Sequence, residues 1–151
     1  MILALVVWVG GIIFFAFVMA PAVFAVLPTH QMAGTVIQRT LPQLHWLGIV
    51  AGIVFLLAAQ FAGRWQRRTA ASVLILLMLA LTLVSQYAVS PRMMRLQAQM
   101  PTIDAVSATD SRRVAFNHLH RCSTGLEGGV LILGLAVVYL TSRENLEDRF
   151  F

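Results

Sequence analysis

Four long apolar runs constrain the fold of this chain more than any other feature of its sequence. A helix of roughly 20 apolar residues spans a bilayer whose hydrocarbon core is about 30 Å thick. Lipid offers no hydrogen-bond partners to free backbone groups, and no run alternates between apolar and polar residues with a period of two. Each run is therefore predicted to form a membrane-spanning helix. The runs cover residues 2–27, 41–63, 69–90 and 122–142.

The composition agrees with a membrane protein and excludes several other classes. Hydrophobic residues make up 59% of the 151 residues and charged residues only 11%, with a mean hydropathy of +0.82. A globular core of this size could not bury that much apolar surface. The basic residues are all arginines, and they lie between the apolar runs, where they suit lipid headgroups and not a nucleic acid. The single cysteine excludes an intramolecular disulfide and a cysteine-only metal cluster.

The predicted fold is an all-α integral membrane protein, an antiparallel bundle of four transmembrane helices that forms one domain over residues 1–151. The segment "PRMMRLQAQMP" is expected to continue the third helix past the membrane surface as far as Pro101. Thr109 or Asp110 is expected to cap a fourth helix that begins outside the bilayer, so helices three and four extend beyond the bilayer on one side. The small and polar residues 28–40 are interpreted as a loop. The expected helices cover about 2–27, 41–63, 69–98 and 110–142.

The orientation of the bundle in the membrane is only weakly constrained. Four spans place both termini and the basic turn "RWQRR" on one side, and the other two connections on the opposite side. The eleven arginines then divide five against six between the two sides, so their count does not decide between the two orientations. The compact basic turn favours cytoplasmic termini, and we expect the chain to lie in a bacterial inner membrane.

The same topology gathers all four histidines at one end of the bundle. His30 follows the first helix, and His45 lies one turn into the second. His118 and His120 stand at the start of the fourth helix, in the stretch "FNHLHRCSTGLEGG". This end of the bundle is therefore where a polar site is expected.

Helical phase divides that stretch into two opposed faces. At about 100° per residue, His120 and Glu127 fall within about 20° of each other, with Thr124 on the same stripe. His118 points nearly the opposite way, together with Cys122. The two histidines of "HLH" therefore cannot both bind one ion on a regular helix.

Glu127 is the charged residue of the fourth apolar run, and an ionised carboxylate facing hydrocarbon costs several kcal/mol. In one interpretation it is bridged to Arg92 or hydrogen-bonded to Gln86, Tyr87 or His120. In a second it is a ligand or proton-relay group with His45 and His120. In a third it is protonated and faces lipid or a partner. The candidate cluster consists of His45, Gln86, Tyr87, Arg92, His120, Thr124 and Glu127.

Two pairs of glycines have the spacing that lets helices approach closely in lipid. Gly48 and Gly52 lie in the second run, and Gly125 and Gly129 lie in the fourth. We interpret both pairs as helix-packing seams. They also favour a homo-oligomer or a larger membrane complex.

Several motifs along nearly the whole chain resemble the transmembrane protein 205-like family, a four-span membrane domain of unknown function. These are "WVGGIIFFAFVMAPAVFAVLP" in the first run, "SPRMMRL" after the third and "FNHLHRCS" before the fourth. The resemblance implies membrane localisation and, for relatives in animals, a connection to drug tolerance and secretion. His120 matches the histidine of the family's L-H-R-x-S motif, and Ser123 matches its serine. The family often has an asparagine in place of Glu127 and an aromatic in place of His45, so a site built from these two residues is not implied for the family.

Two classes of function remain. The first is a membrane bundle without catalytic residues that acts as an accessory or assembly protein or handles a small molecule in the lipid bilayer. The alternative is a bundle that binds haem through His45 and His120, or copper with the help of Met93, Met94 and Met100. The first class is favoured because methionine in an apolar chain is usually packing, and because the sequence lacks a P-loop, a G-x-S-x-G motif and an H-E-x-x-H motif.

Overall fold

The computed structural model describes residues 1–61, 69–100, 106–107 and 109–150. Within them, four helices are long and apolar enough to cross a membrane. The first span consists of α1 (Ile2–Phe14), the π-helical turn Phe15–Met19 and α2 (Ala20–Val26). The second span is α3 (His30–Phe61). The third consists of α4 (Thr69–Val84), the π-helical turn Ser85–Val89 and α5 (Ser90–Ala98), and the fourth lies in α6 (Ser111–Phe150).

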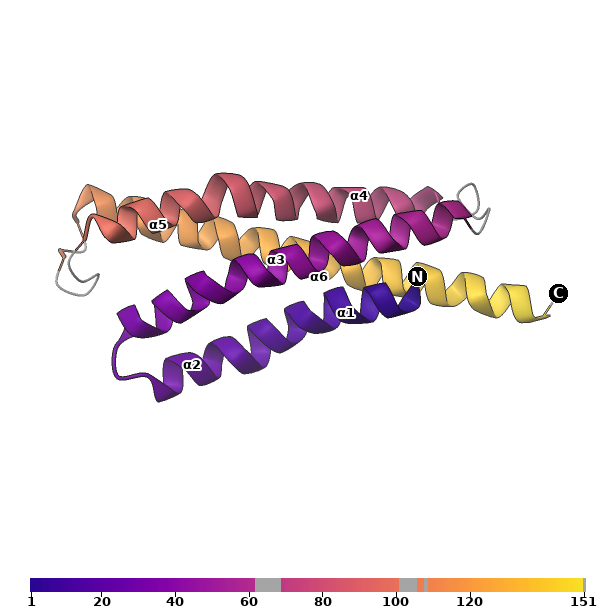
Figure 1. Cartoon of the computed structure of the whole chain (residues 1–151), viewed down its shortest axis with the longest axis horizontal. Coiled ribbons are helices and arrows are strands. Elements are labelled where there is room, and N and C mark those ends of the chain that lie inside the picture. The colour runs from indigo at the N-terminus through magenta and orange to yellow at the C-terminus, as the bar shows by residue number, and fades with distance from the viewer. Residues whose placement is uncertain (62–68, 101–105, 108, 151) are drawn as a thin grey trace.

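The four spans run alternately up and down, so that both termini lie at the same end of the molecule (Figure 1). α1 packs against α3, α3 against α4, α4 against α6, and α6 against α1. Each span therefore contacts the next along the chain, and the last returns to the first. This confirms the predicted all-α bundle of four antiparallel spans.

Two prolines lie inside spans without breaking them. Pro21 and Pro91 each follow a π-helical turn, in which the residue before the proline donates its N–H to the carbonyl five residues back. A proline has no N–H to donate, and its ring crowds the carbonyl four residues earlier. The wider turn gives the ring room beside that carbonyl, so the span continues past each proline.

The start of α3 corrects the sequence prediction. The helix begins at His30, and not at residue 41, and it contains Pro42. Thr29 caps it, because its Oγ1 accepts the N–H of Met32 at 3.2 Å. At about 1.5 Å per residue, a helix of 32 residues is about 48 Å long, which exceeds a hydrocarbon core of about 30 Å. The polar composition of residues 30–40 therefore marks a helical segment outside the hydrocarbon, and not a loop.

α6 begins as predicted and ends later. Asp110 caps it: Oδ1 accepts the N–H of Arg112 at 2.8 Å, and the carboxylate also accepts from that guanidinium at 3.1 and 2.9 Å. These hydrogen bonds from Arg112 hold the pKa of Asp110 down to about 2. The helix continues to Phe150, beyond the predicted end at residue 142, because residues 143–150 include no glycine or proline to stop it.

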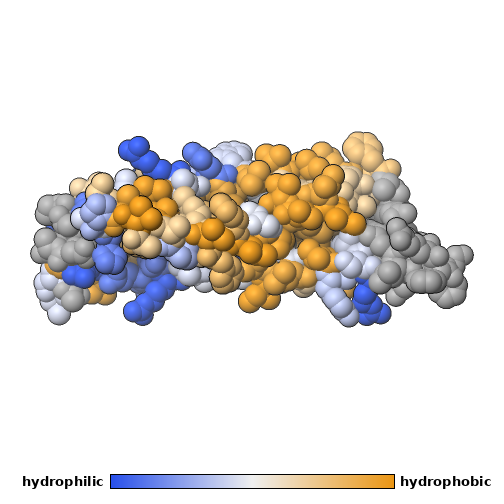
Figure 2. All heavy atoms as spheres, turned by 90° about the horizontal axis from the view of Figure 1, so that it is seen from below, coloured by the Kyte–Doolittle hydropathy of each residue, from blue (hydrophilic) through white to orange (hydrophobic). Residues whose placement is uncertain are grey.

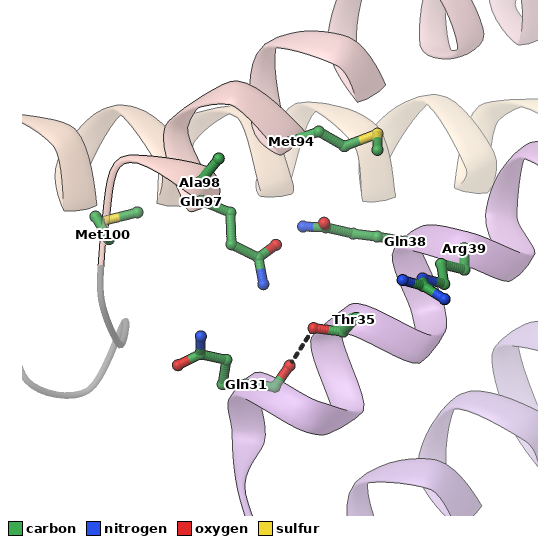
Figure 3. A pocket seen from close by; sticks show the side chains of 8 residues that line it. All are labelled: Gln31, Thr35, Gln38, Arg39, Met94, Gln97, Ala98 and Met100. Carbon is green, nitrogen blue, oxygen red and sulfur yellow. Dashed lines mark hydrogen bonds between the residues drawn. The ribbon is translucent and has the colours of Figure 1, made fainter.

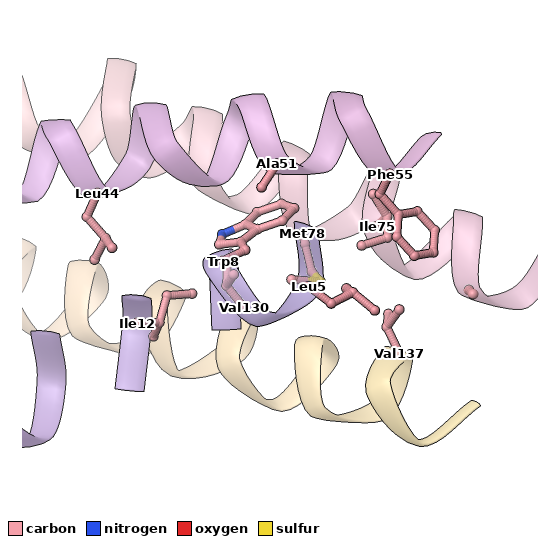
Figure 4. Packing of buried hydrophobic residues seen from close by; sticks show 11 residues of the cluster. Leu5, Trp8, Ile12, Leu44, Ala51, Phe55, Ile75, Met78, Val130 and Val137 are labelled. Carbon is pink, nitrogen blue, oxygen red and sulfur yellow. The ribbon is translucent and has the colours of Figure 1, made fainter. Parts of the chain in front are cut away.

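Trp8 lies at the centre of the apolar core, where it is 2% exposed (Figure 4). Its indole ring lies on the glycine face of α3. A Cβ at Gly48 would overlap Nε1 of the ring, and one at Gly52 would lie 2.7 Å from Cζ3. The ring can approach α3 this closely only because both positions lack a side chain. The cluster around it includes Leu5, Ile12, Leu44, Ala51, Phe55, Ile75, Met78, Val130 and Val137.

The glycine pair of α6 does not have the predicted packing role within this chain. A Cβ at Gly125 would meet nothing within 4 Å, and one at Gly129 would make an ordinary contact with Leu81 at 3.6 Å. The close approach on α6 is at Gly134 instead, where a Cβ would lie 2.7 Å from Cγ2 of Val9. Gly125 lies on the exposed side of α6, because the buried side passes through Val130 and Gly134.

The outer surface of the bundle is largely apolar. Leu3, Val26 and Phe61 are at least 80% exposed, and all four spans expose further large hydrophobic side chains. Figure 2 shows hydrophobic side chains over the middle of the molecule, with hydrophilic side chains gathered at the end that carries α5. Such a surface suits a lipid bilayer and not water.

Candidate functional site

His45 is the largest polar side chain that is fully buried among the described residues. It lies on the side of α3 that also buries Leu44, Gly48 and Ile49, and only 1% of it is exposed. The residue follows Pro42 by less than one turn, at the beginning of the apolar part of α3. An imidazole buried this deeply requires hydrogen-bond partners for its two nitrogens.

Both ring nitrogens of His45 have partners, and the two partners belong to two other spans. Nδ1 lies 2.7 Å from Oε1 of Gln86, which belongs to the π-helical turn between α4 and α5. Nε2 lies 2.6 Å from Oε1 of Glu127 on α6. We call these three residues the polar triad. One imidazole thus joins the second, third and fourth spans.

The three side chains of the triad can together carry no net charge. Oε1 of Gln86 can only accept, so Nδ1 of His45 carries a hydrogen that it donates to Gln86. The contact between Nε2 and Glu127 then contains one proton, on the nitrogen as an imidazolium beside a carboxylate, or on the oxygen as a carboxylic acid beside a neutral imidazole. Both forms have no net charge. This explains how an acid is kept in an apolar span, since a pair without net charge avoids most of the penalty of an isolated carboxylate.

The depth of the triad follows from where its members stand in the apolar runs. His45 is four residues inside the second run, Glu127 five residues inside the fourth, and Gln86 four residues before the end of the third. At about 1.5 Å per residue, each lies about 6–8 Å inside its run. The triad is therefore near the membrane surface opposite the termini, and not at the midplane. The side chain of Glu127 is 19% exposed, whereas that of His45 is 1% exposed.

The remaining residues of the predicted cluster do not join the triad. His120 is exposed and stacks on Phe116, with ring centroids 6.4 Å apart. Thr124 is exposed and donates its hydroxyl to the carbonyl of His120 at 3.0 Å. Tyr87 is 61% exposed beside Gln86, and Arg92 is exposed on α5.

His120 lies outside because the inner side of α6 drifts around the helix. Towards the start of α6, the inner side passes from Glu127 to Ser123, which is 5% exposed, and then to Leu119. His120 follows Leu119 by one residue, which is a rotation of about 100° around the helix, and it therefore faces outward. A phase difference of about 20° over seven residues is too small to reveal this from sequence.

Sequence reasoning missed two buried hydroxyl groups near the triad members, those of Ser85 and Thr82. Ser85 and Thr82 are 0% and 2% exposed, and their hydroxyl oxygens have no hydrogen-bond partner among the described residues. Ser123, one turn before Glu127, is also buried. The sequence contains part of the information needed to find Ser85 and Thr82. They share one face of the third span with Met78 and Val89, at spacings of three and four residues, which is typical of the buried face of a helix.

The arrangement does not fit the haem or copper alternative. A bis-histidine haem site would need a free nitrogen on His45, but both nitrogens are engaged, and His120 lies outside the interior. Met93 is buried while Met94 is 50% exposed, so these two do not face one ion. Among the described residues, no three histidine, cysteine, aspartate or glutamate side chains are grouped so that they could hold a metal ion.

Comparison with known proteins gives a family and no activity. No curated protein matches the chain, and no solved structure matches it. The family described as "Domain of unknown function (DUF4149)" matches residues 3–102, which cover the first three spans with His45 and Gln86 and end before Glu127. This match does not by itself confirm the resemblance to the transmembrane protein 205-like family. Because residues 3–102 are well over half of the 151-residue chain, this protein belongs to the DUF4149 family, an uncharacterised family of membrane type.

Proposed function

We propose that this protein is a non-enzymatic membrane bundle with an accessory or assembly role, in which the polar triad fixes three spans relative to one another. The observation that carries the proposal is the pair of hydrogen bonds from one buried imidazole to two other spans. A shift of any one of these spans by a single turn would separate the partners by about 5.4 Å. The triad therefore favours one arrangement of the bundle over its neighbours.

Energetics support a register role. An interhelical hydrogen bond in a membrane contributes only about 0.6–2 kcal/mol. A polar group left without a partner in hydrocarbon costs more, about 1–3 kcal/mol or beyond. Misaligned bundles would leave the imidazole, the carboxyl and the amide unsatisfied together. The triad thus adds more to specificity than to stability.

The surroundings of the triad give less support to catalysis or to a transport cycle. Its three residues are not among those that line the surface hollow between α3 and α5. His45 is closed off by packing, and both of its ring nitrogens are engaged by Gln86 and Glu127. A small molecule handled by this protein would therefore meet the outer surface of the bundle, and not the triad.

We further propose that the bundle works in a bacterial cytoplasmic membrane with both termini in the cytoplasm, as a homo-oligomer or within a larger complex. The three arginines among residues 64–68, which lie outside the described residues, support the orientation by their charge. The open face at Gly125 supports a helix–helix contact with another chain, because a neighbour could approach there without meeting a side chain. The resemblance to the transmembrane protein 205-like family is retained as part of this proposal.

The test compares His45→Ala with His120→Ala in protein purified in detergent. The first change removes the imidazole that contacts both other members of the triad, and the second removes an exposed histidine at the same end of the bundle. We expect His45→Ala to lower the unfolding temperature by roughly 6–12 °C, while His120→Ala changes it by less than about 2 °C. Cross-linking in native membranes should give the same oligomers for His120→Ala as for the parent protein, and altered ones for His45→Ala.

Two results would overturn the proposal. Equal effects of the two changes on unfolding and cross-linking would remove the register role of the triad. A Soret absorption band, or stoichiometric copper, that is lost in His45→Ala would replace that role with cofactor binding.

A further inference from the structure

A hollow of about 370 Å³ lies between the first turns of α3 and the third span (Figure 3). It is separate from the polar triad. α3 contributes residues at positions i, i+4, i+7 and i+8, which form one face of the helix, and α5 faces them across the gap. The lining includes Gln31, Thr35, Gln38 and Arg39 from α3, and Met94 and Gln97 from α5.

The hollow lies at the membrane surface. The part of α3 that lines it precedes the apolar run that begins at residue 41, and α5 follows the run that ends at residue 90. This is the end of the molecule where hydrophilic side chains gather in Figure 2. Groups at this depth meet phospholipid headgroups, whereas groups of the triad lie deeper.

The polar lining is cationic and rich in hydrogen-bond donors. Arg39 is exposed, and its guanidinium makes no hydrogen bond or ion pair among the described residues. The side-chain amides of Gln38 and Gln97 add N–H donors, and within the described part of the chain no acidic residue lines the hollow. In Figure 3 the side chains of Gln31 and Gln97 point into the gap between the two helices. This combination favours an anion with several acceptor oxygens, such as a phosphate.

Gln97 adds a requirement for a donor on the ligand. Its Oε1 is buried and has no hydrogen-bond partner among the described residues. A buried carbonyl oxygen without a partner is unfavourable, so a ligand that donates a hydrogen bond here would be preferred to one that cannot. A phosphate that carries a hydroxyl or an ammonium group a few bonds away can accept hydrogen bonds from Arg39 and also donate one to Oε1 of Gln97.

The rest of the lining is apolar and suits an amphiphile. Met94 is 50% exposed at the edge of the hollow, and Met32 is 50% exposed nearby on α3. Exposed ion pairs in water contribute little by themselves, so a free phosphate would be held weakly by Arg39. A lipid brings its acyl chains alongside the apolar helices and is already concentrated at this depth.

We propose that this hollow binds the headgroup of a phospholipid, with Arg39 and the glutamine amides on the phosphate and Gln97 accepting a hydrogen bond from a hydroxyl or ammonium group. The site is independent of the register role of the triad. It predicts a preference for phosphatidylglycerol and phosphatidylethanolamine over phosphatidylcholine, whose headgroup has no N–H or O–H to donate.

The test measures lipid retention by native mass spectrometry and thermal unfolding of the delipidated protein with each of these three lipids added. We expect phosphatidylglycerol to be retained and to raise the unfolding temperature, with apparent affinity reduced about tenfold or more in Arg39→Gln. The matched control is Arg95→Gln, which changes an exposed arginine of α5 that does not line the hollow. Gln97→Leu should abolish the preference over phosphatidylcholine while both lipids still bind.

Three outcomes would overturn the proposal. The first is an equal loss of binding in Arg39→Gln and Arg95→Gln, which would indicate a diffuse basic surface. The second is equal protection by inorganic phosphate, which would indicate a site for a free anion. The third is no selective retention of any of the three phospholipids. Because Arg39 is exposed and makes no contact with the triad, its substitution should leave the bundle folded, so loss of binding can be separated from unfolding.

Discussion

Replacement of Glu127 gives the sharpest test of the polar triad, because two substitutions of similar size have opposite consequences for His45. In Glu127→Gln, the new side chain still reaches Nε2 of His45 and can donate an amide N–H to it. The imidazole is then neutral and still donates to Gln86 through Nδ1. All three positions keep a hydrogen bond, and we expect a loss of stability below about 1 kcal/mol.

Glu127→Leu removes the partner of Nε2 and leaves that nitrogen unsatisfied in a side chain that is 1% exposed. The expected cost combines about 1–2 kcal/mol for the unsatisfied nitrogen with about 1 kcal/mol for the lost interhelical bond, or about 2–3 kcal/mol in total. The added leucine gives little compensation, since lipid is as apolar as the bundle interior. For a chain of this length, 2–3 kcal/mol lowers the unfolding temperature by roughly 4–12 °C.

The assay is thermal unfolding in detergent, followed by circular dichroism and by tryptophan fluorescence, to which the buried Trp8 contributes. Thr124→Leu serves as the control, because Thr124 is exposed on the same helix less than one turn away, and we expect a change within about 0.5 kcal/mol. Equal stability of Glu127→Gln and Glu127→Leu would refute the reasoning, because it would mean that the carboxyl faces lipid or solvent and makes no bond to His45.

Two further predictions concern helix packing and the start of α6. Gly48→Ala should destabilise the protein by about 1–3 kcal/mol, since its Cβ would overlap the rigid indole of Trp8. Gly125→Ala should be neutral or slightly stabilising, because its Cβ would meet no other atom. Equal losses of stability for the two variants in chemical denaturation would contradict this packing. The lowered pKa of Asp110, about 2 against an ordinary value near 4, means that its carboxylate stabilises the cap above pH 4 and loses that effect as the pH falls from about 4 to 2. The protection of the first amides of α6 against hydrogen exchange, taken relative to the intrinsic exchange rate at each pH, should therefore decrease over this range in the parent protein and not in Asp110→Asn. Identical acid profiles would show that the cap does not depend on the charge.

Part of the candidate site could be read from the sequence in advance. The cost of a carboxylate in hydrocarbon singles out Glu127 without any coordinates, and the up-and-down topology places His45 and Gln86 at the same end of the bundle. The choice among partners could not be made in this way. Arg92, Tyr87 and His120 stand at the same end and are just as polar, yet all three are exposed. Only the rotation of each helix about its axis separates them from His45 and Gln86.

The sequence by itself determined the number of spans, their helical form and their alternation, because lipid leaves a chain with apolar runs of this length no other way to satisfy its backbone. It also narrowed the cap of α6 to Thr109 or Asp110, because capping depends on neighbouring residues alone, and the structure shows that the cap is Asp110. The tertiary structure decided what depends on contacts between distant segments. These features are the triad, the exposed position of His120, and the different packing of two glycine pairs with the same spacing. Gly48 and Gly52 face Trp8, while Gly125 faces outward, since helix rotation and crossing are set by packing across the whole bundle.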